Sequence, residues 1–206
     1  MVKMDDSEVA HPTINPERLA QVTTLLSGDH APNTDGAMCA MEAAAWIAGE
    51  EWSDHPQCVC PVIGAFMRSW NDALPDADRT RLLLPLIPKT IGTRGSEALE
   101  ARRATMAADW YVRTFTPAWL RLAGLTAHAD TLAGMPEILS FEKTPSIRTA
   151  LEAARKDAEA ARSAAESAAG SAAESALKTT CEELQASALQ LVERMCAITE
   201  NEQVTA

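Results

Sequence analysis

The last third of the chain is dominated by alanine and contains no proline after Pro145. Between Ala150 and Ala176, 13 of 27 residues are alanine. Because alanine has the highest helix propensity of all residues, this segment needs little tertiary help to form helix. Thr144 and Pro145 supply a cap and a first-turn proline. We therefore expect a long helical segment over residues 144–200, followed by a frayed tail over 201–206.

An apolar seam runs along this segment with steps of four and three residues, which is the spacing of a heptad repeat. Its first half consists of Ile147, Leu151, Ala154, Ala158, Ala161 and Ala165. Its second half consists of Leu177, Cys181, Leu184, Ala188, Leu191, Met195 and Ile198. Steps of four residues join the two halves, as in a coiled-coil stutter. The segment is either one long helix or a helical hairpin bent near Gly170.

Two roles are open for the seam. It either associates with a second copy or with a partner helix, or it packs on the rest of its own chain. Since leucine buries more apolar area than alanine, we expect the stronger contact in the second half.

Residues 15–143 are predicted to form a compact helical module, preceded by a flexible arm over 1–14. Helix starts are indicated by capping residues and first-turn prolines, at Asn15-Pro16, Asp35, Pro61, Pro75 and Ser96. Helix ends are indicated by Gly28, Gly49 and Gly124. Pro117 either kinks the helix that begins after Ser96 or starts its successor. The chain has only nine glycines and 4% aromatic residues, which argues against a strand-rich sandwich. The predicted fold class is all-α.

The net charge of −11 restricts the kinds of partner. Residues 1–60 hold ten acids and two bases, whereas residues 61–144 are nearly balanced with nine acids and ten bases. Nucleic-acid binding requires clustered Lys and Arg, so this distribution disfavours it. The apolar runs are too short to span a membrane, and no export signal is visible, so we expect a cytoplasmic protein.

Four possible metal ligands lie close together in sequence, namely Cys39, His55, Cys58 and Cys60. Zinc or iron could take such thiolates and an imidazole. However, one residue separates Cys58 from Cys60, whereas structural zinc sites typically have two. Cys60 also precedes Pro61 and could be an activated nucleophile at a helix start. Buried, unliganded thiols are the alternative.

The tryptophans Trp46, Trp70, Trp110 and Trp119 fall at core-like positions of predicted helices, so we expect them to pack in the core. No P-loop, dinucleotide-binding, metalloprotease or serine-hydrolase motif is present.

One stretch of the chain resembles a group of hypothetical proteins from actinobacteria and their phages. The likeness covers roughly residues 38–125 and includes MEAAAWIAGE, SDHP, SWNDALPD and LIP followed by GTRG. The resemblance implies a compact module, and no functional residue can be carried over from that group.

These observations predict a non-enzymatic interaction, scaffold or regulatory protein without a cofactor, which binds itself or a protein partner through its C-terminal helix. One alternative is a zinc- or iron-binding or thiol-dependent enzyme that uses the cysteine and histidine cluster. Another is an acidic phage-type inhibitor of a basic host protein.

Overall fold

The computed structural model describes residues 13–32, 36–141, 144–165 and 171–200. In these residues the regular elements are helices and no strand is present, which confirms the predicted all-α class. The chain divides into two compact units, Met1–Ser96 (unit 1) and Glu97–Ala206 (unit 2). The boundary that we predicted between residues 143 and 144 therefore lies inside unit 2. No helix in the described part of the chain combines the length and the apolar character needed to cross a bilayer.

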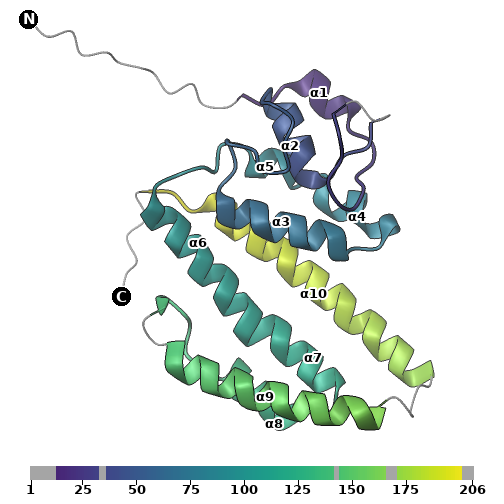
Figure 1. The fold of residues 1–206 in the computed structure, drawn as a ribbon, viewed down its shortest axis with the longest axis vertical. Coiled ribbons are helices and arrows are strands. Elements are labelled where there is room, and N and C mark those ends of the chain that lie inside the picture. Colours follow the sequence, from purple (N-terminus) through teal and green to yellow (C-terminus); the bar gives the residue numbers. More distant parts are fainter. Residues whose placement is uncertain (1–12, 33–35, 142–143, 166–170, 201–206) are drawn as a thin grey trace, which may run out of the picture. The chain divides into compact units, whose positions relative to one another are not determined.

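Unit 1 is built around its second helix (Figure 1). Its helices are α1 (Pro16–Gln21), α2 (Ala40–Ala48), α3 (Pro61–Ala73), α4 (Asp76–Leu83) and α5 (Ile87–Thr90). Helix α2 contacts α1, α3 and α5, and its small side chains let these neighbours approach closely. Met41 and Ile47 have no exposed surface. The alanine-rich sequence of α2 thus places it in the core.

The first helix begins where the sequence predicts and ends earlier. The Asn15 side chain accepts hydrogen bonds from the amides of Glu17 and Arg18, both at 3.0 Å, which confirms the predicted cap. The helix ends at Gln21 instead of continuing to Gly28. The amide of Leu25 donates to Thr80 Oγ1 at 2.9 Å, so tertiary contacts take up a donor that helix continuation would have used.

The start of α2 corrects a second prediction. Asp35 lies outside the described residues, and the helix is capped by Cys39 instead. Cys39 Sγ accepts the amide of Glu42 at 3.5 Å, and the Glu42 carboxylate accepts the amide of Cys39 at 2.7 Å. This reciprocal arrangement is a capping box with cysteine in the place of serine or threonine. The helix ends at Gly49, which has a φ of 78° and confirms the predicted stop.

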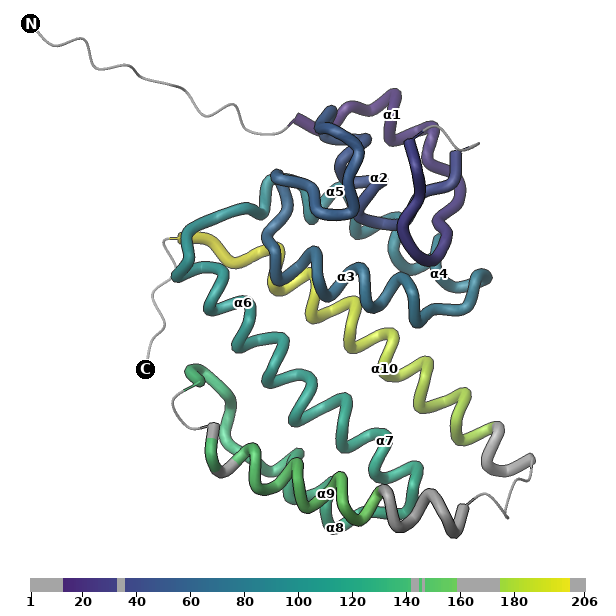
Figure 2. The backbone as a smooth tube through the Cα atoms, in the orientation of Figure 1, coloured from purple at the N-terminus to yellow at the C-terminus, as the bar shows by residue number. Residues whose placement is uncertain are grey.

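Unit 2 contains α6 (Glu97–Trp110), the π-helical segment η1 (Tyr111–Phe115), α7 (Thr116–Leu122), α8 (Thr126–Ala133), α9 (Thr144–Ala165) and α10 (Ser171–Ala197). Figure 2 shows that α6 leads through η1 into α7 without a change of direction. Pro117 lies in the first turn of α7 and so starts a successor helix, one of the two outcomes predicted for it. A proline ring clashes with the carbonyl four residues earlier, and the wider π turn before Pro117 relieves this clash.

The first half of the apolar seam packs within unit 2. A buried cluster consists of Val112, Leu120, Ala129, Leu132, Ile138 and Ala154. The partly buried side chains of Ile147 and Leu151 on α9 pack against it. The seam positions Ala161 and Ala165 lie outside the residues whose side chains the structure describes.

The second half of the seam lies on α10, a separate helix from α9. Residues 166–170, including Gly170, lie between the two helices and outside the described residues, so the choice between one long helix and a hairpin stays a prediction. Helix α10 contacts α6 and α7. The following seam residues are at most 7% exposed: Leu184, Ala188, Leu191 and Met195. Cys181 and Ile198 are half-buried, and Leu177 is 42% exposed.

Candidate functional site

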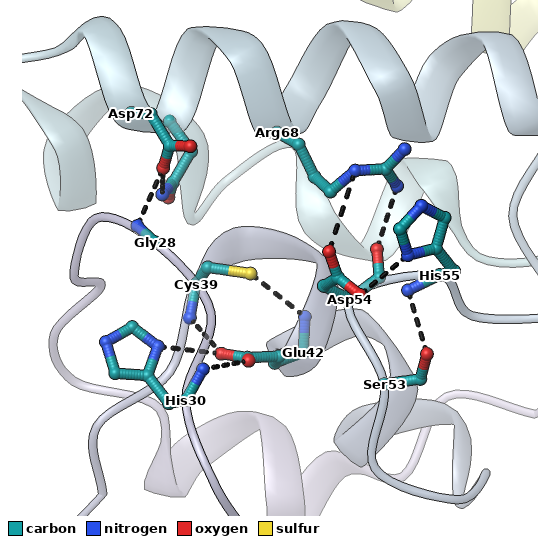
Figure 3. Close-up of polar contacts among 10 residues, drawn as sticks. Gly28, His30, Cys39, Glu42, Ser53, Asp54, His55, Arg68 and Asp72 are labelled. Atoms are coloured by element: carbon teal, nitrogen blue, oxygen red, sulfur yellow. Dashed lines mark hydrogen bonds and ion pairs between the residues drawn. The ribbon is translucent and has the colours of Figure 1, made fainter.

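The buried carboxylate of Glu42 fixes the loop that precedes α2. Glu42 is 1% exposed, and besides the Cys39 amide it accepts hydrogen bonds from the His30 amide at 2.5 Å and from His30 Nδ1 at 2.9 Å (Figure 3). Trp52 Nε1 in turn donates to the His30 carbonyl at 2.7 Å. A buried carboxylate needs such donors, because each lost one leaves a desolvated group unpaired. This network accounts for His30 and Glu42 as structural residues.

A second hydrogen bond joins the loop that follows α1 to α3 in unit 1. The amide of Gly28 donates to Asp72 Oδ1 at 2.8 Å, and this bond lowers the pKa of the Asp72 carboxyl. Because the folded-state pKa lies below the unfolded one, the contact contributes stability above the unfolded pKa and loses it as the pH falls through the lowered value.

The buried thiols of Cys39 and Cys58 are poor nucleophiles. Burial raises the pKa of the Cys39 and Cys58 thiols to about 12 in each case. Cys60 has no exposed surface and its amide donates to Thr93 Oγ1 at 3.0 Å. All five cysteines are free of disulfide bonds. The thiols of Cys39 and Cys58 are therefore almost fully protonated near neutral pH, whereas the activated nucleophile at Cys60 stays a prediction.

We expect this difference to appear in alkylation rates. At pH 8 a thiol with a pKa of about 12 is ionised in about one molecule in ten thousand, so iodoacetamide will modify half-buried Cys181 and Cys196 long before Cys39 or Cys58. Peptide mapping of the alkylated protein measures each rate, and urea-unfolded protein is the control, in which all five react alike. Modification of Cys39 at the rate of Cys181 in the folded protein would contradict the assignment.

The predicted metal ligands do not converge. In the described ranges, no three His, Cys, Asp or Glu side chains lie close enough together to hold a metal ion. Cys39 is engaged at the start of α2, and His55 Nδ1 lies 2.6 Å from Asp54 Oδ1. A site for zinc or iron made of Cys39, His55, Cys58 and Cys60 thus has no support from the geometry.

The SDHP loop (residues 53–56) is held by α3. Arg68 NH1 donates to the carbonyl of Asp54 at 2.9 Å, and Arg68 Nε lies 3.8 Å from Asp54 Oδ2. The hydroxyl of Ser53 accepts the amide of His55 at 3.0 Å. Figure 3 shows Arg68 reaching from α3 to the loop, with the His55 ring beside the Asp54 carboxylate. Arg68, absent from our predicted site, is the residue that ties this loop to a helix.

Unit 2 carries a row of aromatic side chains that the sequence analysis did not identify. Tyr111, Phe115 and Trp119 follow one another every four residues, and we call this row the aromatic ridge. The rings of Tyr111 and Phe115 stack at 5.3 Å, and those of Phe115 and Trp119 meet edge-on at 6.1 Å. Tyr111 is 54% exposed and Trp119 37% exposed. The prediction that Trp119 packs in the core is therefore wrong.

Trp110 connects the aromatic ridge to α10. Trp110 lies 5.3 Å from Phe115 between ring centroids, and its Nε1 donates to Ser187 Oγ on α10 at 3.0 Å. Trp46, Trp70 and Trp110 are only half-buried, so each of these side chains packs partly in the core and partly faces solvent. Tryptophan is large enough that partial burial is common.

Comparison with known proteins found no matching family model, no matching curated protein and no matching solved structure.

Proposed function

We propose that this chain is a non-enzymatic helical interaction protein that self-associates through the aromatic ridge of unit 2. The observation that carries the proposal is the exposure of Tyr111 and Trp119 in one row with Phe115. Aligned aromatic side chains left open to water are costly on a surface and are frequent at the centres of protein interfaces. The buried seam residues of α10 offer no comparable exposed surface.

The arginines nearest to the ridge in sequence are paired with acids of unit 2, and they lie two residues from ridge positions, which is not the same helix face. Arg113 NH1 lies 3.0 Å from Asp109 Oδ1, and Arg121 NH2 lies 2.9 Å from Asp130 Oδ1. The ridge residues themselves, Tyr111, Phe115 and Trp119, carry no acid that would select a basic protein. A neutral apolar ridge is complementary to an identical ridge.

The size of the ridge indicates a weak interface. Aromatic side chains bury about 150–250 Å² each, so the exposed parts of these three amount to roughly 300 Å² per copy. A stable interface buries about 800 Å² per partner. We therefore expect reversible association with a dissociation constant on the order of 100 µM.

Sedimentation velocity from low micromolar to near-millimolar protein, with a thiol reductant present, tests the proposal. The weight-average sedimentation coefficient should rise with concentration for the native chain and stay constant for the double variant Tyr111→Ser, Trp119→Ser. Leu177→Ser removes an exposed apolar side chain of the α10 seam and is the matched control, which should associate like the native chain. A monomer at every concentration, or equal loss in the control, would refute the ridge as the contact.

Ionic strength separates the two kinds of partner. Two copies with a charge of −11 each repel one another, so added salt should strengthen self-association. Binding of a basic partner would instead weaken with salt.

A further inference from the structure

A cavity of about 220 Å³ lies in unit 1 between the SDHP loop and the N-terminal part of α3. Its lining includes His55, Gln57, Gly64, Arg68 and Arg94 and contains no Asp or Glu. The whole chain has 29 acidic and 18 basic residues, so a cavity with two arginines, a histidine and no acid departs from the surrounding composition. A second, smaller cavity shares Arg68 but is lined by Asp29, Asp54 and Asp72. We call the first one the arginine cavity.

Arg68 is held in place with donors to spare. Its side chain is 24% exposed, and its one hydrogen bond within the described part of the chain runs from NH1 to the Asp54 carbonyl. A guanidinium carries five N–H donors, so most of those of Arg68 have no hydrogen-bond partner in the described part of the chain. The partly buried position strengthens a charge-assisted hydrogen bond to an anion relative to one at a fully exposed arginine.

Gly64 brings the backbone of α3 close to the Arg68 guanidinium. A Cβ atom at this position would lie 3.4 Å from Arg68 NH1 and 3.8 Å from Met41 Sδ. These are ordinary contact distances, so a methyl group at this position would fit beside the guanidinium and narrow the cavity slightly.

Two acids of the neighbouring loop already have partners. The Asp54 carboxylate contacts His55 Nδ1 and faces Arg68 Nε, and Glu50 Oε2 accepts the amide of Gln57 at 2.6 Å. Neither acid lines the cavity. The positive end of the α3 dipole points toward the same region and adds to the attraction that the arginines exert on an anion.

We propose that the arginine cavity binds the phosphate group of a small phosphorylated molecule. The guanidinium groups of Arg68 and Arg94 match the several oxygens and the double negative charge of a phosphate monoester. The cavity is larger than a phosphate ion needs, so it has room for a small organic group attached to the phosphate. This site lies in unit 1, whereas the aromatic ridge lies in unit 2. A negative result for one proposal therefore leaves the other proposal unaffected.

Titration of the isotope-labelled full chain with phenyl phosphate, followed by amide NMR at constant ionic strength, tests the site. We expect saturable shifts at Gln57, Gly64 and Arg94, and tighter binding of phenyl phosphate than of inorganic phosphate. Arg68→Gln should weaken binding at least about tenfold, since it removes a charged donor set. Arg81→Gln, at an exposed arginine of α4 paired with Asp78, is the matched control and should bind like the native chain.

Additional variants and a second ligand provide outcomes that would refute the proposal. Should Arg68→Gln lose the folded amide spectrum, Arg68→Lys and Arg94→Gln provide the same comparison, and both should weaken binding. Shifts that grow linearly without saturation, or an equal loss in Arg81→Gln, would mean that no site exists. Binding of benzoate as tight as that of phenyl phosphate would overturn the assignment to phosphate.

Discussion

Replacement of Glu42 with alanine will destabilise unit 1 by about 3 kcal/mol or more. The carboxylate is 1% exposed and accepts the amides of Cys39 and His30 together with His30 Nδ1. Each buried donor left without an acceptor costs about 1–3 kcal/mol, and alanine supplies none. Because 1.4 kcal/mol is a factor of ten, amides of α2 should exchange with deuterium about two orders of magnitude faster.

Two further variants locate the cause of this loss. Glu42→Gln keeps the shape and one acceptor oxygen but points an NH₂ group at a donor, so its effect should lie between those of the native chain and Glu42→Ala. Glu51→Ala removes an exposed carboxylate of the neighbouring loop and should change stability by less than about 0.5 kcal/mol. Similar exchange rates in Glu42→Ala and Glu51→Ala would show that the loop network does not hold α2.

Replacement of Arg103 with leucine will destabilise unit 2. Arg103 is 2% exposed, and from α6 it donates Nε to the Met195 carbonyl at 2.8 Å and NH2 to the Ile198 carbonyl at 3.3 Å. These carbonyls lie at the end of α10, where no further turn supplies amide donors. A cation there also interacts favourably with the helix dipole. We expect a loss of about 2–4 kcal/mol, measured as faster exchange in the last turns of α10.

The neighbouring arginine is the matched control. Arg102 NH1 donates to the Thr199 carbonyl at 3.2 Å in an exposed position, so Arg102→Leu should cost well under 1 kcal/mol. If both variants behave alike, the buried bonds of Arg103 do not fix α10 to α6.

The elements that local chemistry determines were predictable. Asn15-Pro16, Pro61 and Gly49 place helix ends where the structure has them, because caps and first-turn prolines act over a few residues. The end of α1 was not predictable in this way, since it depends on Leu25 bonding to Thr80, 55 residues away. The helical propensity of the alanine-rich segment predicted helix correctly but did not determine which surfaces the helices would contact.

The candidate sites were harder to find from sequence. The cap at Cys39 could have been found from Glu42 three residues later, which is the spacing of a capping box. Tyr111, Phe115 and Trp119 recur every four residues, but helical spacing alone does not tell a buried face from an exposed one. Arg68 and Arg94 are 26 residues apart in sequence, and only the fold brings them to one cavity.

Site-specific photo-crosslinking tests the proposed self-association most directly. Benzoylphenylalanine in the place of Tyr111 should yield a covalent dimer on irradiation of concentrated protein, with the crosslink mapped to the ridge of the second copy. The same group in the place of Leu177, which is 42% exposed on the α10 seam, should yield little dimer. A dimer formed from position 177 and not from position 111 would contradict the ridge and support association through the C-terminal helix.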